Sequence, residues 1–394
     1  MKESSFKGGK EMKKKLVSLF LSTTMAAALL TGCGSSTGTA TDTAVTTEAS
    51  DTVVTEASET AGTAESVEKP VAGVCWYNFA DTFISNARQS LINIAAADGT
   101  VEVVDADSQN DTATQTNNMN NMFSKDVNYL VLNNINTGAI DDICDQILEQ
   151  GCYGIFANTD SPSDENFEKN NKLYSVSSVA TQSGDIMGEA IADYWKEHPE
   201  ADRNGNGKLD YVMLLGIQGH YDTTVRSQNS VKTIQDAGIE MNQIGGELVC
   251  EYSRAKAQET VAALLANYSD DIDCIIGCND DMALGAIEAL KAGGFFGDGG
   301  KYVMVAGVDA TAVGCDAVRD GTLLVTALNN PITLAKSIYK VMRLTSEGKE
   351  VTTESMGIDG VSVEGHRVWL DYKAITKDNV EEAGYDVNDT TIDY

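Results

Sequence analysis

The chain has 394 residues, enough for two domains of about 100 to 200 residues that each bury a core. Its formal net charge of −31 argues against a nucleic-acid partner, because phosphate recognition requires clustered Lys and Arg. The eight cysteines are scattered and include no Cys-x-x-Cys pair, so neither a disulfide framework nor a zinc site is predicted. We interpret the cysteines after Cys33 as small buried hydrophobic residues.

The N-terminus has the features of an export signal. A lysine-rich stretch precedes an apolar run over residues 16–30, which is short for a membrane span. The run ends in Leu30-Thr31-Gly32-Cys33, which resembles a bacterial lipobox; the alternative is a buried cysteine that follows small residues. We therefore predict a lipoprotein signal peptide over residues 1–32 and a lipid anchor on Cys33, with Met12 as an alternative start. The mature protein would be extracytoplasmic and held to the membrane by this anchor alone.

Residues 33–69 are predicted to be the anchored cysteine and a flexible linker. The segment consists of Ser, Thr, Ala, Gly and Glu with few large apolar side chains. Such a composition cannot bury enough surface to offset the entropy of ordering. It would act as a mobile spacer between the anchor and the folded body.

From residue 71 onward, short β-branched or apolar runs alternate with longer amphipathic stretches. We predict strands over residues 71–77, 101–105, 129–133, 153–157, 209–216, 274–278, 302–308 and 323–328. Helices are predicted over residues 82–97, 139–150, 222–237, 254–266, 282–292 and 332–344. This alternation predicts an α/β fold with two Rossmann-like domains, each a parallel sheet flanked by helices.

Polar residues follow the predicted strands, where parallel sheets bind ligands. They are Asp81, Asn158, His220, Asp222, Arg226, Asn279, Asp280, Asp281, Asp309 and Asn329. A single Asn or Asp here is more often a helix cap or turn residue, and Asp280 and Asp281 fit that simpler role. His220 is equally consistent with a structural histidine, and Arg226 with a solvated helix face.

Together these groups suit a sugar. Carboxylates accept from hydroxyl groups, carboxamides donate and accept, and a guanidinium spans two neighbouring oxygens. Phe83 and Tyr252 could cover the apolar C–H faces of a pyranose ring, although ordinary core packing is the simpler interpretation of a lone aromatic residue.

Residues 202–210 read Asp-Arg-Asn-Gly-Asn-Gly-Lys-Leu-Asp. Asp202, Asn204, Asn206, the Lys208 carbonyl and Asp210 have the spacing of an EF-hand Ca²⁺ loop, with Gly207 at the position of the sharp turn. The alternative is a Gly/Asn-rich surface turn. The twelfth position is Met213, so a carboxylate from elsewhere in the chain must complete the shell.

The chain from about residue 71 resembles the periplasmic galactose/glucose-binding protein family. The resemblance includes Asp81-Thr82-Phe83, the loop 202–210, Gly219-His220-Tyr221-Asp222 with Arg226, Cys278-Asn279-Asp280-Asp281, Gly307-Val308-Asp309 and Leu328-Asn329. It implies sugar hydrogen bonds from Asp81, Asn158, His220, Asp222, Arg226, Asn279, Asp309 and Asn329, and stacking by Phe83 and Tyr252. The family example has Trp where this chain has Tyr252. The family's remote Ca²⁺ ligand, a Glu, falls on Asp273, and Asp210 stands where Gln is expected.

The resemblance also implies the domain organisation. One sugar-binding subdomain would comprise residues 71–177 and 330–365, and the other residues 178–329 and 366–394. Three crossings, near residues 177–179, 329–330 and 366–368, would form a hinge, with the ligand in the cleft between the domains. The expected function is delivery of a monosaccharide, galactose or glucose, to an ABC permease by a monomeric protein without nucleic-acid binding.

Three other functions fit parts of the sequence. A glycosidase could use the carboxylates around such a cleft, but the chain shows no nucleophile motif and no separate acid/base pair, so an enzyme is not predicted. A sensor that presents bound sugar to a chemoreceptor or sensor kinase would use the same cleft. A DNA-binding repressor is disfavoured by the export signal and by the lack of a basic helix-turn-helix segment.

Overall fold

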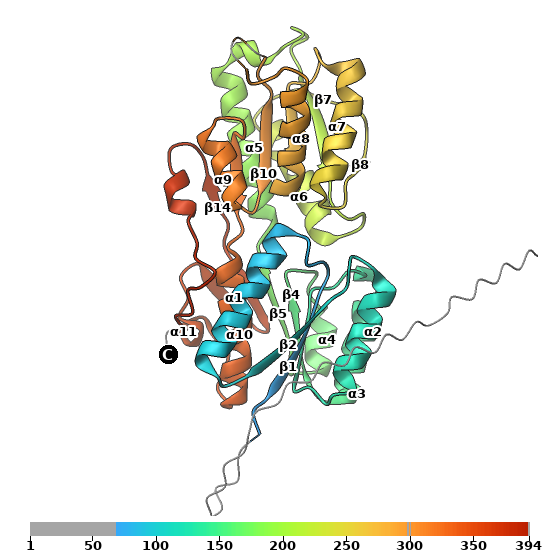
Figure 1. The fold of residues 1–394 in the computed structure, drawn as a ribbon, viewed down its shortest axis with the longest axis vertical. Helices are drawn as coiled ribbons and strands as arrows, with labels where there is room; N and C mark the ends of the chain where they lie inside the picture. Colours follow the sequence, from blue (N-terminus) through green and yellow to red (C-terminus); the bar gives the residue numbers. More distant parts are fainter. Residues whose placement is uncertain (1–67, 298, 300, 393–394) are drawn as a thin grey trace, which may run out of the picture. The chain divides into compact units, whose positions relative to one another are not determined.

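A computed structural model describes residues 68–392 except residues 298 and 300 (Figure 1). The predicted signal peptide, Cys33 and nearly all of the predicted linker lie outside the described residues. None of the described helices is both long and apolar enough to cross a membrane. The seven cysteines within the described range are buried, as the sequence predicts, and none of them forms a disulfide with another described residue.

The first sheet has the strand order β12-β13-β5-β4-β3-β1-β2, and all its neighbours are parallel except β12 and β13. Its strands are β1 (Val71–Trp76), β2 (Glu102–Asp107), β3 (Tyr129–Leu132), β4 (Tyr153–Ala157), β5 (Leu173–Ser178), β12 (Val361–Glu364) and β13 (Arg367–Leu370). The accompanying helices are α1 (Thr82–Asp98), α2 (Thr112–Phe123), η1 (Thr137–Ala139), α3 (Ile140–Gln150), α4 (Asp164–Lys169), α10 (Pro331–Ser346) and α11 (Thr353–Met356). We call these elements the first lobe.

The second sheet has the order β14-β11-β10-β9-β6-β7, with β8 also pairing β6, and only β14 is antiparallel to its neighbour. Its strands are β6 (Leu209–Leu215), β7 (Met241–Gln243), β8 (Leu248–Val249), β9 (Cys274–Gly277), β10 (Met304–Val308), β11 (Val325–Leu328) and β14 (Lys373–Ile375). The helices are α5 (Ala180–Glu197), η2 (Pro199–Ala201), α6 (Tyr221–Asp236), α7 (Arg254–Tyr268), α8 (Asp280–Ala292), α9 (Ala312–Arg319) and η3 (Val380–Ala383). We call these the second lobe; the predicted fold class is confirmed.

The first sheet is covered on both faces because its strands alternate buried side chains. Val74 and Trp76 of β1 belong to the core shared with α1 and α10, whereas Cys75 belongs to the core beneath α2 and α3. Gly73 permits this second contact, since a Cβ there would lie 2.7 Å from the Met122 side chain. Strands buried on both faces read as continuous apolar runs, which is why the sequence shows them clearly.

The sequence analysis did not predict α2, α4, α5, α9 or α11, and for α2 and α5 the composition explains why. Helix α2 is rich in Thr and Asn, and its buried residues are only Gln115, Met119 and Met122. Helix α5 contains Gly184 and Gly188, which normally weaken a helix. In the structure these glycines allow α6 to pack closely against α5. A Cβ on Gly184 would lie 2.5 Å from the Asn229 side chain, and a Cβ on Gly188 would lie 2.6 Å from the Thr233 side chain.

The chain crosses between the lobes three times up to β14, and residues 387–392 then return to contact α1 and α10 of the first lobe. The first two crossings fall between β5 and α5 and between β11 and α10, at the predicted residues. The third was predicted near residues 366–368, but β13 pairs with β5 in the first sheet, so the chain leaves that sheet only after Leu370. Residues 367–370 therefore belong to the first lobe rather than the second. The Gly365-His366 segment, where the family resemblance placed the crossing, connects β12 and β13 instead.

Candidate functional site

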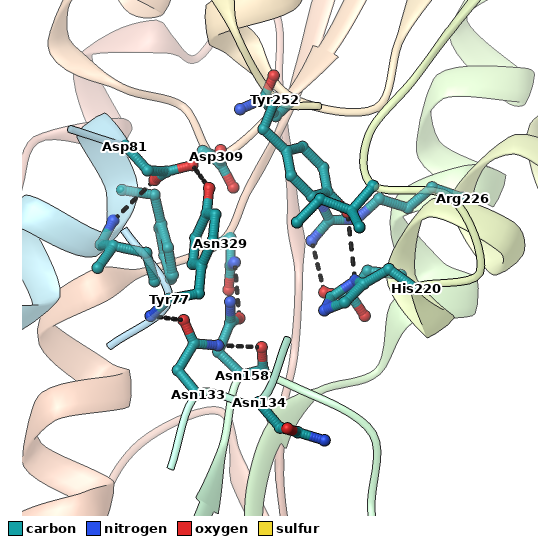
Figure 2. Close-up of a pocket in the computed structure, with 15 residues that line it drawn as sticks. Tyr77, Asp81, Asn133, Asn134, Asn158, His220, Arg226, Tyr252, Asp309 and Asn329 are labelled. Carbon is teal, nitrogen blue, oxygen red and sulfur yellow. Dashed lines mark hydrogen bonds and ion pairs between the residues drawn. The ribbon is translucent and has the colours of Figure 1, made fainter. Parts of the chain in front are cut away.

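All ten predicted sugar-contacting residues line one pocket. Its lining consists of Tyr77, Asp81, Phe83, Ile84, Asn133, Asn134, Asn158, Ile217, His220, Asp222, Arg226, Tyr252, Asn279, Asp309 and Asn329 (Figure 2). These residues follow the carboxyl ends of strands in both lobes, the position expected for a ligand in parallel sheets. The space between the lining atoms is about 430 Å³, open solvent included.

Asp81 is positioned by the first turn of α1. It is the helix N-cap, with one carboxylate oxygen accepting from the Ile84 amide at 2.9 Å and the other from the Tyr77 hydroxyl. Burial raises the pKa of Asp81, and these two hydrogen bonds oppose the rise. A helix N-terminus stabilises a carboxylate at this position, so the fold presents a fixed acceptor to the pocket.

Two aromatic residues enter the pocket from opposite lobes. Phe83 is buried in the first turn of α1. Tyr252 lies over Gly216, where a Cβ would be 2.2 Å from the tyrosine ring. The Tyr252 hydroxyl is 2.7 Å from Thr223 Oγ1 and 3.3 Å from His220 Nδ1. Tyr252 therefore contributes a polar group to the site as well as a ring that could stack on a sugar.

Arg226 is a buried residue of α6 that lines the second-lobe side of the pocket. Its Nη1 donates to the Cys278 carbonyl at 2.8 Å, and its Nη2 donates to Asp222 at 3.2 Å and to the Tyr372 hydroxyl at 2.9 Å. The Nε donor has no hydrogen-bond partner within the described part of the chain and is shielded from solvent. A buried unpaired donor is costly, so this atom indicates where a ligand oxygen would be stabilised.

Three asparagines supply amide groups at the meeting point of the lobes. Asn279 caps α8 by accepting from the Met282 amide at 3.0 Å, which leaves its NH₂ group for a ligand. Asn329 accepts from the Ser178 hydroxyl at 2.7 Å and donates to Asn158 at 3.5 Å. Asn158 has φ +50°, a left-handed conformation that Asn tolerates better than most residues.

The pocket has an excess of acidic groups. Asp81, Asp222 and Asp309 line it, and Arg226 is the single cation in the lining. Burial lowers the pKa of His220, which favours a neutral imidazole. Burial and the neighbouring Asp81, Asp280 and Asp281 raise the pKa of Asp309 well above its usual range, despite the attraction of Arg226. The environment therefore favours donors such as hydroxyl groups over anions.

Five lining residues were missed by the sequence analysis: Tyr77, Ile84, Asn133, Asn134 and Ile217. Asn133 and Asn134 follow β3 directly, so the same strand-end rule that found Asn158 would have found them. Tyr77 ends the predicted first strand and donates to Asp81.

The cap interpretation of Asp280 is wrong, because Asn279 caps α8 and the buried Asp280 bonds Thr311 and Thr326 instead. Asp281 accepts from Thr82 of the first lobe.

The loop from Asp202 to Asp210 is folded around carboxylates. Asp202 accepts from the amides of Gly205 at 2.9 Å and Gly207 at 2.8 Å, and both glycines have positive φ angles of 71° and 78°. Asp273 accepts from the amides of Arg203 and Asp210 at 3.0 and 2.9 Å. The predicted remote carboxylate therefore lies against this loop.

The donor set of this loop fits a hard cation. Burial, together with the nearby carboxylates of Asp210 and Asp202, raises the pKa of Asp273 to about 6, although the amides of Arg203 and Asp210 oppose the rise. The amides of Asn204 and Asn206 converge on Asp210 at 2.9 and 2.7 Å, and a half-turn of each would present oxygen in place of NH₂. No three His, Cys, Asp or Glu residues in the described range are grouped to hold a metal, so a cation would also need these amide oxygens.

Comparison with known proteins identifies the family. Residues 72–350 match the model of the periplasmic binding protein domain. The chain belongs to this family. Its members are binding proteins, not enzymes.

The periplasmic binding protein family supplies relatives along most of the chain. The D-galactose/methyl-galactoside binding periplasmic protein MglB of Haemophilus influenzae is 29% identical over 78% of this chain and 90% of its own length. The xylitol-binding protein of Mycolicibacterium smegmatis is 23% identical over 82% of this chain and 81% of its own length. The structure of an ABC transporter solute-binding protein of Bacillus halodurans with bound myo-inositol has a TM-score of 0.62 and 25% sequence identity. The match covers 80% of this chain and 96% of that one.

Proposed function

We propose that this protein is an extracytoplasmic solute-binding protein that binds a monosaccharide, galactose or glucose, and delivers it to an ABC permease. The observation that carries the proposal is the convergence of ten predicted sugar-binding side chains from two lobes on one pocket. Family membership supports the transport role, and the galactoside-binding relative supports the choice of sugar.

The pocket chemistry suits a neutral polyhydroxylated ring. Asp81, Asp222 and Asp309 would accept from sugar hydroxyl groups, and the Arg226 Nε would donate to a sugar oxygen. Phe83 and Tyr252 would cover the C–H faces of the ring. Three carboxylates against one guanidinium disfavour an acidic sugar, because its carboxylate would be desolvated among like charges.

Calorimetric titration tests this proposal. Purified protein is titrated with galactose, glucose, ribose, xylitol, myo-inositol and galacturonate, and the solutions are then analysed for sugar products. We expect the tightest binding for galactose or glucose, no binding of galacturonate, and no turnover. Preference for a pentose or a cyclitol would overturn the choice of sugar, and release of products would overturn the binding-protein assignment.

We propose further that Asp202, Asn204, Asn206, the Lys208 carbonyl, Asp210 and Asp273 hold a structural Ca²⁺. The support is the ligand spacing, the positive φ angle of Gly207 and the mutual repulsion of the carboxylates around Asp273. None of these residues lines the sugar pocket, so the ion would stabilise the loop before β6 without taking part in sugar recognition.

We propose that lipidation of Cys33 anchors the protein to the membrane. The support is the lipobox-like sequence that follows the apolar run. Replacement Cys33→Ala should move the protein from the membrane fraction to the soluble fraction and leave sugar affinity unchanged, because the predicted linker separates the anchor from the pocket. Continued membrane retention of the unacylated variant would refute the anchor.

A further inference from the structure

The carboxyl end of β10 carries an unusual backbone turn at the pocket. Asp309, which lines the pocket, has a φ angle of +113°, and the next residue, Ala310, has +48°. Residues with a Cβ rarely adopt such angles, and they persist only where the surrounding structure holds them. The turn directs the Asp309 side chain into the pocket, near Tyr77 and Asp81 (Figure 2).

Three successive amides fix this turn. The Asp309 amide donates to the Ala327 carbonyl at 2.8 Å, and the Ala310 amide donates to Thr326 Oγ1 at 3.0 Å. The Thr311 amide donates to Asp280 Oδ2 at 2.8 Å. The first two partners lie on β11, so the turn is bonded to the neighbouring strand and to the start of α8.

Asp280 connects these bonds. Besides the Thr311 amide, its carboxylate accepts from the Thr311 hydroxyl at 3.0 Å and from the Thr326 hydroxyl at 2.7 Å. Thr326 thus donates to Asp280 and accepts from Ala310, which joins the carboxylate to the turn through one hydroxyl. Asp280 itself is fully buried and does not line the pocket.

Two glycines make room for this carboxylate. A Cβ on Gly307 would lie 2.5 Å from Asp280 Oδ1, and a Cβ on Gly314 would lie 2.1 Å from Oδ2. Helix capping does not require Asp280, because Asn279 caps α8. The residue is therefore bonded where it controls the turn at Asp309.

We propose that Asp280 is a positioning residue for ligand binding, which acts through Thr326 and Thr311 to hold the Asp309 carboxylate toward the pocket. This inference rests on the proposed sugar-binding function of the same pocket. Asp280→Asn keeps the shape of the side chain but replaces one accepting oxygen with an NH₂ group. Thr326→Val removes the linking hydroxyl and leaves a side chain of the same shape.

The test is a double-mutant cycle with Asp309. In the parent protein, Asp280→Asn and Thr326→Val should each weaken sugar binding about three- to tenfold, as expected for one lost hydrogen bond. In the Asp309→Ala background, neither change should weaken binding further. Equal losses in both backgrounds, or no loss in the parent background, would overturn the proposal.

Asp185→Asn is the matched control. Asp185 accepts from Asn229 at 3.1 Å and from Thr233 at 2.9 Å at the contact between α5 and α6, away from the pocket. Its replacement should lower thermal stability without changing sugar affinity. If Asp280→Asn fails to fold, the double-mutant cycle is measured with Thr326→Val and Asp309→Ala.

Hydrogen exchange separates this inference from the proposed function. The amides of residues 309–311 should exchange faster in Asp280→Asn than in the parent, with or without sugar. If the parent binds no sugar of the panel, the proposed function fails, and this exchange still decides the role of Asp280. Unchanged protection at these three amides would show that Asp280 does not hold the turn.

Discussion

Arg226 is a residue that the fold and the pocket share. Its Nη atoms bond the Cys278 carbonyl, Asp222 and Tyr372, and only its Nε hydrogen and one Nη1 hydrogen are free for a ligand. The sequence analysis treated this guanidinium as a fork devoted to the sugar. Asp309 differs, because its carboxylate accepts no hydrogen bond from the described residues.

Replacement of these two residues should therefore have different consequences. Asp309→Ala should weaken sugar binding about fivefold to a hundredfold, because loss of one partner of a buried hydrogen bond costs about 1 to 3 kcal/mol, and stability should be retained. Arg226→Ala should weaken binding and also cost about 3 to 5 kcal/mol of stability, because Asp222 would be left buried without its partner. Calorimetry and thermal denaturation measure both effects. Parent-like affinity of Asp309→Ala would place the sugar elsewhere.

Residue types at strand ends were predictable, but their partners were not. The ordered motifs placed Asp81, Arg226 and the other site residues correctly around one pocket. Bonds between distant segments, such as Arg226 to Tyr372 or Asp280 to Thr326, depend on which strands become neighbours, and local spacing does not contain that information. This is why Asp280 was interpreted as a local cap.

At the level of elements, the loop before β6 should respond to chelation. Removal of the proposed Ca²⁺ would leave the carboxylates of Asp202, Asp210 and Asp273 to repel one another, so the melting temperature should fall by several degrees, as about 1 to 2 kcal/mol would produce. Sugar affinity should persist. The measurement is thermal denaturation of chelator-treated, metal-free protein with and without added Ca²⁺, and identical curves would contradict the site.

The close contact of α7 and α8 gives a second prediction. A Cβ on Gly285 would lie 2.2 Å from the Arg254 carbonyl, so Gly285→Ala must push the helices apart. We expect a loss of about 1 to 3 kcal/mol in the free energy of unfolding, measured by denaturant titration. Gly384→Ala is the control, because no atom lies within 4 Å of the added Cβ. Equal stability of the two variants would show that the helices can separate freely.

Elements buried on both faces were the easiest to predict. Strands such as β1, β4 and β9 appear as apolar runs, whereas α2 and α5 carry Asn or Gly for reasons that only their packing partners explain. Strand β13 was assigned to the wrong lobe because its partner β5 lies almost 200 residues earlier in the chain. Pairing between strands so far apart in the sequence depends on the topology of the fold and cannot be read from the local sequence pattern.

At the level of the whole molecule, the crossings are bonded to each other and to the pocket. Ser178 of the first crossing bonds Asn329 of the second, and Tyr372 of the third bonds Arg226. Two of these four residues, Asn329 and Arg226, line the pocket. A ligand that contacts them would act directly on the segments about which the lobes move.

Asp160 should make closure sensitive to pH. It follows β4 in the first lobe, and burial together with Asp222 of the second lobe raises its pKa to about 6, although the Tyr221 amide opposes the rise. Opening the cleft would return this pKa toward its usual value of about 4. The closed form therefore binds a proton more tightly, and closure is favoured as pH falls from 7 to 5.

The corresponding measurement compares the parent with Asp160→Asn. The ratio of parent to variant affinity should rise about tenfold between pH 7 and pH 5, the effect of one proton with this shift in pKa. The ratio removes the contributions of Asp81, Asp309 and His220, which titrate in both proteins. A ratio that stays constant over this range would show that Asp160 keeps the same environment in the open and closed forms.

The two ends of the described chain both belong to the first lobe. Val71 begins β1, and at the other end Asn93 of α1 donates to the Val387 carbonyl, Lys336 of α10 pairs with Asp389, and Ile392 packs on the first-lobe core. A pair of fluorophores attached at the two ends would therefore keep a constant separation when sugar binds, and energy transfer between them would stay silent. An optical sensor built on this protein needs one fluorophore in the second lobe, for example at the exposed end of Lys232 on α6.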